Sequence, residues 1–187
     1  SPSFTVFDAV RVLELVARAG SIGRGKLAEK LALGRGATRT LLTHLTDAGL
    51  VSSSRGGCAF TAKGEKVWNE LHSLLPWKVE VEQNELTFAA HNVAVLVKDK
   101  ASNVKKGLEQ RDAAVRAGAK GTATLVCKDG KLLLPTVSAD VASDYPEAFN
   151  AISRLMKPED NDVIIISSAD NAKEAECGAL AAAWTLI

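Results

Sequence analysis

The segment from Lys26 to Thr61 constrains the fold of this chain more than any other part of the sequence. Two short stretches with apolar residues at helical spacing flank Leu33-Gly34-Arg35-Gly36, and a hairpin pattern with the tip Ser53-Ser54-Arg55-Gly56-Gly57 follows them. Gly34 and Gly36 are expected to supply the conformational freedom of a sharp turn. A helix, a glycine-containing turn, a cationic second helix and a glycine-rich hairpin together predict a winged helix-turn-helix, which usually lays its second helix in the DNA major groove.

Apolar residues at helical spacing extend this predicted domain in both directions. A first helix is expected from about Val6 to Ala19, with an apolar stripe made of Val6, Val10, Leu13 and Val16. The helix after Gly34 is expected to continue to Ala48, with an inner face made of Ala37, Leu41, Leu45 and Ala48. A fourth helix follows Thr61 and ends before Pro76, because proline breaks a helix interior. The predicted domain therefore spans residues 1–75.

The remaining residues predict a second domain. Residues 76–91 are expected to form a linker or an extra strand, since they include a short alternating segment. From residue 92 the expected order is a strand at 92–97, a helix at 103–117, strands at 122–127 and 131–134 around the hairpin signal Lys128-Asp129-Gly130, a helix at 145–156, a strand at 162–167 and a helix from 171 onward. This order predicts an α+β chain, with a ferredoxin-like βαββαβ domain over residues 92–187 and an extra C-terminal helix.

Charge is distributed unevenly between the two halves. The whole chain has a net charge of +1, but residues 1–75 carry ten Lys or Arg against six Asp or Glu, whereas residues 76–187 carry thirteen against sixteen. A basic first half joined to an acidic second half is typical of a nucleic-acid-binding domain fused to a sensor or assembly domain.

Several classes of protein are disfavoured by what the sequence does not contain. No apolar run approaches the ~20 residues of a membrane span, and the N-terminus lacks the charged-then-apolar pattern of a signal peptide. Cys58, Cys127 and Cys177 are widely spaced, which predicts reduced thiols in a cytoplasmic protein. No histidine stands at ligand spacing from a cysteine, so we expect no metal. Without a Gly-x-Ser-x-Gly motif or a phosphate loop, we expect neither a catalytic residue nor a cofactor, and no enzyme.

Nine residues of the first domain are candidate DNA contacts. Arginine can bond guanine with two hydrogen bonds, and threonine can contact a phosphate or a thymine methyl group. An arginine at the hairpin tip suits the DNA backbone or the minor groove. The candidates are Lys26, Arg35, Thr38, Arg39, Thr40, Thr43, His44, Arg55 and Lys63. The alternative is a solvated helix face on a domain that binds protein.

A second candidate site is expected around Arg111. Val104, Leu108 and Val115 predict a core-facing stripe, and Arg111 falls within it by helical spacing. A buried charge is costly unless it is paired or bonded to a ligand. With Asp112 and Lys120, which lies between Gly118 and Gly121, Arg111 could bind a small anionic effector. The alternative is that the Arg111 side chain extends from the side of the helix into solvent.

The final helix is rich in small apolar residues from Cys177 to Ala183. Small residues permit close packing, so this face is expected either to cover the sheet or to form a homodimer surface. The residues proposed for the dimer surface are Ala179, Ala182, Ala183 and Trp184.

Several segments resemble a family of archaeal proteins that join a winged helix-turn-helix to a C-terminal domain of unknown function. The resemblance is carried by Gly34 to Leu42, by Arg111-Asp112-Ala113-Ala114, by Gly118 to Pro135 and by Tyr145-Pro146-Glu147. The chain departs from that family in the insert-like segment Trp77–Asn92. The resemblance implies similarity to transcriptional regulators through the N-terminal domain, and it implies no particular ligand or target.

These observations predict a transcriptional regulator that binds double-stranded DNA, forms a homodimer and does not enter a membrane. The C-terminal domain is expected to dimerise or to sense a small-molecule effector. The alternative is an interaction module that docks on protein or RNA within the transcription or translation machinery.

Overall fold

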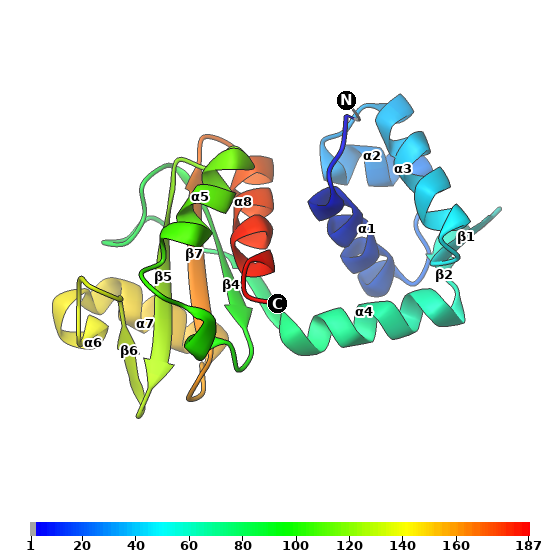
Figure 1. The fold of residues 1–187 in the computed structure, drawn as a ribbon. Coiled ribbons are helices and arrows are strands. Elements are labelled where there is room, and N and C mark those ends of the chain that lie inside the picture. Colours follow the sequence, from blue (N-terminus) through cyan, green and yellow to red (C-terminus); the bar gives the residue numbers. More distant parts are fainter. Residues whose placement is uncertain (1–2) are drawn as a thin grey trace. The chain divides into compact units, whose positions relative to one another are not determined.

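The structure is a computed structural model that describes residues 3–187 (Figure 1). The chain divides into two compact units, of which the first ends at His72 and the second begins at Ser73. None of the helices in the described range is both long enough and apolar enough to cross a membrane.

Unit 1 has the order of helices and strands that the sequence predicts. Its elements are α1 (Val6–Ala19), α2 (Arg24–Leu31), α3 (Arg35–Asp47), β1 (Val51–Ser54), β2 (Gly57–Phe60) and most of α4 (Ala62–Leu74). The strands β1 and β2 form an antiparallel hairpin in which Val51 pairs with Phe60. An isolated bridge between Ile22 and Cys58 joins the hairpin to the segment that connects α1 with α2.

Helix α1 differs from its prediction in which residues it buries. Asp8 and Arg11 are buried together with the apolar face, whereas Val6 is exposed. Burial of both charges is possible because Arg11 Nη1 lies 3.0 Å from Asp8 Oδ1 and also donates to the carbonyl of Leu31 at 3.0 Å. Asp8 is also held by a capping box with Thr5 at the start of the helix. The ion pair lies within α1, and the hydrogen bond from Arg11 to the Leu31 carbonyl ties α1 to the end of α2.

The turn between α2 and α3 also differs from expectation. Ala32, not a glycine, adopts the left-handed conformation there, with φ of 51°. The N–H groups of Ala32 and Leu33 close the end of α2 by donating to Glu29 and Ala28 carbonyls, which stabilises this conformation. Gly34 has φ of −62° and is the residue that precedes α3. The glycines at 34 and 36 are therefore not required by the turn.

Unit 2 is built on a five-stranded sheet. Its elements are β3 (Trp77–Glu80), β4 (His91–Val97), a 3-10 turn (Ala101–Asn103), α5 (Leu108–Arg116), β5 (Gly121–Lys128), β6 (Lys131–Leu133), α6 (Val141–Asp144), α7 (Pro146–Met156), β7 (Val163–Ala169) and α8 (Ala172–Trp184). The strand order is β3-β4-β7-β5-β6, and all neighbours are antiparallel.

This strand order corrects the ferredoxin-like prediction. A ferredoxin-like domain would place the second strand of the β5-β6 hairpin between β4 and β5. Here β7 occupies that position and β6 lies at the edge. The run of apolar residues from Val163 to Ile166 suits a strand covered on both faces, whereas β6 has only three residues and begins with an exposed lysine, as suits an edge. The order of elements along the chain was predicted, but their order in the sheet was not.

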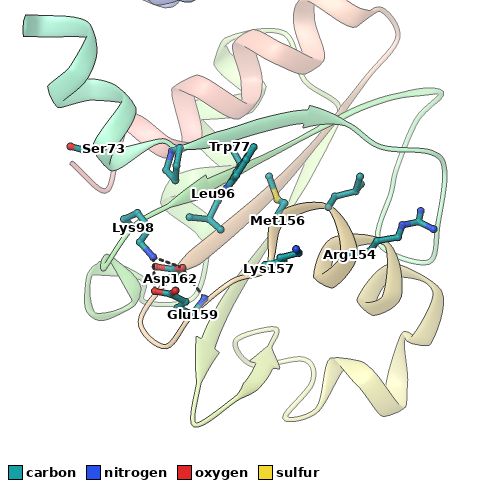
Figure 2. Close-up of a pocket in the computed structure, with 11 residues that line it drawn as sticks. Ser73, Trp77, Leu96, Lys98, Arg154, Met156, Lys157, Glu159 and Asp162 are labelled. Carbon is teal, nitrogen blue, oxygen red and sulfur yellow. Dashed lines mark hydrogen bonds and ion pairs between the residues drawn. The ribbon is translucent and has the colours of Figure 1, made fainter.

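One carboxylate joins the loop after β4 to the loop before β7. Asp162 is almost completely buried, and its Oδ2 lies 3.1 Å from Lys98 Nζ (Figure 2). The same side chain accepts the backbone N–H groups of Asp99 and Glu159. Asp162 therefore holds the adjacent ends of the two central strands.

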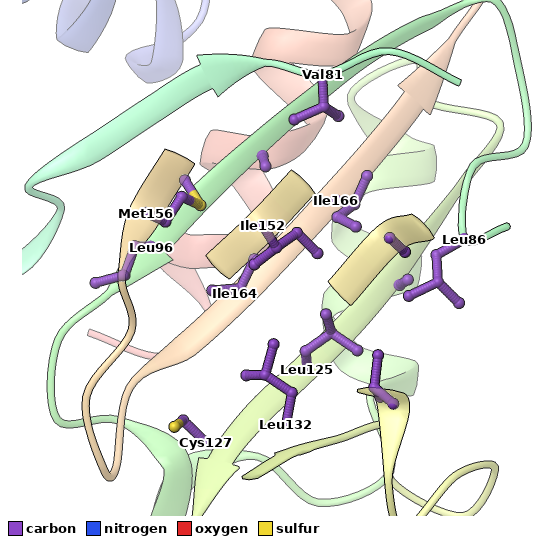
Figure 3. Packing of buried hydrophobic residues seen from close by; sticks show 14 residues of the cluster. Val81, Leu86, Leu96, Leu125, Cys127, Leu132, Ile152, Met156, Ile164 and Ile166 are labelled. Carbon is purple, nitrogen blue, oxygen red and sulfur yellow. The ribbon is translucent and has the colours of Figure 1, made fainter. Parts of the chain in front are cut away.

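Helices cover both faces of the sheet. On one face, Ile152 and Met156 of α7 pack against a cluster that includes Leu96, Leu125 and Ile164 (Figure 3). The opposite face is covered by α5 and α8. Because side chains alternate along a strand, Ile164 and Ile166 point toward α7 while Ser167 lies beneath α8. Unit 2 is thus a three-layer arrangement of helix, sheet and helix.

The segment after α4 belongs to unit 2 and supplies the extra strand of the prediction. Strand β3 pairs with β4, with Trp77 opposite Leu96. Beyond β3, Val81 and Leu86 enter the core beside α7, and Glu85 Oε1 accepts the N–H of Ala148 in the first turn of that helix at 3.0 Å. These contacts integrate the segment into the second core.

Helix α5 corrects the prediction of a buried stripe. The helix begins only at Leu108, after Gly107 in a left-handed conformation, so Val104 lies outside it. Leu108 and Val115 are 51% and 48% exposed. The buried residues are Gln110, Ala113 and Ala114. Ala113 and Ala114 suit the close approach of α8, and the burial of Gln110 is offset by a hydrogen bond from its side-chain amide to the Thr185 hydroxyl at 2.7 Å. Arg111 therefore faces solvent.

Helix α8 uses its small residues within its own unit. Ala179, Ala182 and Ala183 are completely buried. A Cβ at Gly178 would lie 2.5 Å from the Ser167 hydroxyl, which shows how closely α8 approaches the sheet. Two roles were predicted for this face, covering the sheet or forming a dimer surface. The three alanines cover the sheet, and because they are buried they are not available as a dimer surface.

Candidate nucleic-acid interface

Helix α3 presents a row of exposed polar residues on one side. Arg35, Arg39 and Thr43 are four residues apart and all are exposed, so they lie along one face of the helix. The opposite face buries Leu41, Leu42 and Leu45. This burial fixes the direction of the arginine row away from the core of unit 1.

The backbone at the start of α3 is open. The helix is preceded by Gly34, no side chain caps it, and a Cβ at Gly34 or Gly36 would have no neighbour within 4 Å. The first N–H groups of a helix have no intrahelical partners and form a site that favours anions. Absence of a Cβ allows a phosphate to approach such a backbone closely.

Thr38 must be removed from the candidate DNA contacts. It is 0% exposed and lies with Leu41, Leu42 and Leu45 at helical spacing on the inner face. Its hydroxyl donates to the Gly34 carbonyl at 3.0 Å, which satisfies the polar group and allows its burial.

The other α3 candidates remain exposed, with particular local partners. Thr40 and Thr43 donate their hydroxyl protons to the carbonyls of Gly36 and Arg39, each at 3.0 Å. Because both hydroxyl protons are donated within the helix, they are not available to a phosphate. The methyl groups of Thr40 and Thr43 can still contact a thymine methyl group. The His44 ring contacts Phe4 edge to face, with ring centroids 5.6 Å apart.

The hairpin places Arg55 at an exposed tip. Two backbone hydrogen bonds between Ile22 and Cys58 tie the hairpin to the segment before α2. Ser21 also donates to the carbonyl of Gly56 beside the tip. Burial of Cys58 in this junction raises the pKa of its thiol, so the thiol stays protonated. The tip is therefore anchored to the same segment that leads into α2.

Lys63 has a local role that the sequence did not indicate. Its Nζ donates to the carbonyl of Ala48 at 2.8 Å, where α3 ends. A cation at a helix C-terminus satisfies a free carbonyl and interacts favourably with the helix dipole. Lys63 is exposed, but its amine already has this partner.

Exposed cations without carboxylate partners gather on α2, α3 and the hairpin tip. Within residues 3–187 no ion pair involves any of them, whereas Arg18 on α1 pairs with Glu14 at 2.8 Å. Two of these cations, Arg24 and Lys30, were not selected from the sequence. Lys30 occupies a polar position of the predicted second helix, whereas Arg24 belongs to α2 only because that helix begins two residues earlier than the expected start at Lys26. The six cations are Arg24, Lys26, Lys30, Arg35, Arg39 and Arg55.

The candidate effector residues of unit 2 are not brought together. Arg111 and Asp112 bond to each other, with Arg111 Nη2 2.9 Å from Asp112 Oδ1, and each side chain is 53% exposed. Lys120, in the segment before β5, instead places its Nζ 3.4 Å from Oδ2 of Asp170, which follows β7. Two separate exposed ion pairs do not form an anion site.

Comparisons with known proteins agree with the division of the chain. Residues 5–66 match a family model described as the PH0730-like N-terminal domain. A solved structure described as hypothetical protein PH0730 from the archaeon Pyrococcus horikoshii OT3 is 29% identical, with a TM-score of 0.80, and the match covers 98% of this chain and 93% of that one. A second structure, hypothetical protein SSo2273 from Sulfolobus solfataricus, is 21% identical over 35% of this chain and 52% of that one, with a TM-score of 0.31. No curated protein matches the chain.

A family model that matches the second unit shows the family to which this protein belongs. Residues 88–186 match the model of a domain of unknown function, DUF4443, over more than half of the chain. The archaeal relative and this domain of unknown function confirm the coarse part of the resemblance seen in the sequence. The protein therefore belongs to the DUF4443 family.

Proposed function

We propose that this protein is a transcriptional regulator in which unit 1 is a winged helix-turn-helix that binds double-stranded DNA. In this proposal α3 enters the major groove and the β1-β2 hairpin is the wing. Arg39 contacts base edges, while Arg35 and the open backbone at Gly34 and Gly36 contact phosphate. The observation that carries the proposal is the exposed row of α3, whose arginines have no ion pair in the described part of the chain.

The charge distribution supports the same proposal. The six unpaired cations lie on the elements that a winged helix-turn-helix directs at DNA, and the acidic residues of α1 are already paired. Unpaired surface cations attract a polyanion and release its counterions. A protein-docking surface would need no such excess of one sign.

A homodimer completes the proposal, since two copies could bind half-sites one DNA turn apart. Unit 2 would then dimerise or sense a small molecule. Its dimer surface would lie away from the alanines of α8, which are buried.

Binding to genomic DNA fragments across a salt series tests the proposal. We expect selection among fragments and a steep loss of affinity with salt, because each phosphate contact contributes a slope of about −0.9 in log K against log salt. Arg55→Ala should weaken binding to all sequences alike. Lys128→Gln, which removes one exposed charge from the last residue of β5 in unit 2, is the control. Binding without fragment preference or salt dependence would favour the alternative, an interaction module for protein or RNA.

A further inference from the structure

Unit 2 contains a pocket where the C-terminal end of α7 meets the β3-β4 edge of the sheet (Figure 2). Its volume is about 480 Å³, which is within the range of small-molecule sites. The expected effector residues Arg111, Asp112 and Lys120 do not line it. The pocket is therefore separate from the effector site that the sequence predicts.

One part of the pocket is apolar and includes a tryptophan. Trp77 and Leu96 are directly opposite each other on β3 and β4, so their side chains lie on the same face of the sheet. Leu96 and Met156 are almost completely buried, whereas Trp77 is 53% exposed. A flat indole ring beside a buried apolar floor can stack against an aromatic ligand.

One end of the pocket holds a lysine between two carboxylates of unequal burial. Lys98 Nζ is 3.1 Å from Asp162 Oδ2 and 3.2 Å from Glu159 Oε2. The Asp162 side chain is 1% exposed, but that of Glu159 is 80% exposed. Burial alone would lower the pKa of Lys98, yet the hydrogen bonds and charges of Asp162 and Glu159 outweigh burial and raise it, so the amine remains charged. The buried Asp162 carboxylate is held in place by its surroundings, whereas the exposed Glu159 carboxylate can be displaced from Lys98 by a ligand.

The other charges of the pocket are cations. Arg154 and Lys157 line it from the end of α7, and no ion pair within the described residues involves either of them. In the view of Figure 2, Lys98, Glu159 and Asp162 gather at one end and Arg154 lies at the other, with Trp77, Met156 and Lys157 between them. The pocket therefore has an excess of positive charge next to its apolar part.

We propose that this pocket binds a small aromatic carboxylate. Its ring would lie against Trp77 over Leu96 and Met156, and its carboxylate would bond Lys157 and take the place of Glu159 on Lys98. The exposed Glu159 carboxylate, which lies 3.2 Å from Lys98 Nζ, shows where the carboxylate of the ligand would bind. This inference concerns unit 2 alone and does not depend on DNA binding by unit 1.

Calorimetric titration of the full chain without DNA tests the inference with three matched probes. Benzoate should bind more tightly than benzamide, which lacks the charge, and than cyclohexanecarboxylate, which lacks the aromatic ring. Binding of all three with equal affinity, or no binding of benzoate at millimolar concentration, would overturn the proposal.

Variants of two exposed charged residues, Lys157 and Glu159, and of Trp77 locate the site. Lys157→Asn should weaken benzoate about tenfold, because it removes a charge-assisted hydrogen bond. Asparagine is chosen because Lys157 has φ of 45°, a region that asparagine tolerates. Glu159→Gln should instead tighten benzoate, since it removes the competing carboxylate. Trp77→Ala should abolish the preference for benzoate over cyclohexanecarboxylate.

Lys128→Gln is the control for a change of net charge, and it should leave benzoate affinity unchanged. Equal weakening by Lys128→Gln and Lys157→Asn would show a general charge effect and reject the pocket. If Trp77→Ala fails to fold, the other two variants still test the proposal, because Lys157→Asn should weaken benzoate binding and Glu159→Gln should tighten it. Both of these positions are exposed, so their replacement should not disturb the core.

Discussion

Helices α3 and α5 each present an arginine that the sequence indicates as functional, and the structure gives the two arginines different surroundings. Arg39 on α3 is exposed and has no ion pair within the described residues. Arg111 on α5 is also exposed, but its guanidinium is bonded to Asp112 at 2.9 Å. An acidic neighbour in contact thus neutralises one arginine, while the other remains available to a polyanion.

The two helices also bury different kinds of residue. The inner face of α3 is made largely of leucines, which fill the core of unit 1. The inner face of α5 has no large apolar residue: Ala113 and Ala114 suit the close approach of α8, and Gln110 donates to the Thr185 hydroxyl. Large apolar residues therefore mark the buried side of a helix only where its neighbour leaves room for them.

The largest expected effect concerns the two faces of α3. Thr38→Arg places a charge at a completely buried position and should destabilise unit 1 by roughly 4–5 kcal/mol, or unfold it. Thr40→Arg, two residues away on the exposed face, should fold normally and bind DNA more tightly. Urea denaturation followed by circular dichroism measures the first effect. Normal stability of Thr38→Arg would mean that this face of α3 is not in the core.

A third arginine extends the comparison, because Arg11 is both buried and paired. Arg11→Met keeps much of the side-chain volume but removes the guanidinium that balances the charge of the buried Asp8 carboxylate. We expect a loss of about 3–5 kcal/mol in the free energy of unfolding. Arg18→Met, which breaks a pair with Glu14 whose arginine is 70% exposed, should change stability by much less, about 0.5–1 kcal/mol. Equal effects of the two variants in thermal denaturation would contradict the importance assigned to the buried pair.

The arginines of α3 and α5 should differ in DNA binding. Arg39→Ala should lower affinity by about 1–3 kcal/mol and relax sequence preference if Arg39 contacts a base. Arg111→Ala should leave DNA affinity unchanged, because its charge is already paired within unit 2. Fluorescence anisotropy with a selected fragment and a scrambled fragment measures both. Equal affinities of Arg39→Ala and the parent protein would exclude this residue from the interface.

The smallest effect separates stability from binding at the start of α3. Gly36→Ala should stabilise unit 1 by roughly 0.5–1 kcal/mol, because alanine favours the helix and its Cβ has no neighbour within 4 Å. The same methyl group should weaken DNA binding if a phosphate approaches this backbone. The melting temperature should rise, and the DNA affinity measured by fluorescence anisotropy on the same sample should fall. A stabilised variant with unchanged affinity would place the phosphate elsewhere.

Local sequence signals predicted much of the molecule. The expected bounds of α1 agree with the structure, the Asp129-Gly130 turn joins β5 to β6 as expected, and α3 ends at Asp47, one residue before the expected Ala48. Each of these features depends on a few adjacent residues, which is why periodicity and turn residues suffice to find it. For the same reason, the exposed row of Arg35, Arg39 and Thr43 could be predicted from helical spacing.

Contacts between distant residues were decided only by the tertiary structure. The sequence did not indicate that Arg11 would be buried with a hydrogen bond to the carbonyl of Leu31 on the next helix. It also did not indicate that Thr38 lies on the face of α3 that packs into the core of unit 1. The position of β7 between β4 and β5 likewise depends on distant elements, because the central strand of the sheet is covered by helices on both faces and favours apolar side chains on both. Spacing along a chain specifies which residues share a face, but burial of that face depends on the size and charge of the element packed against it.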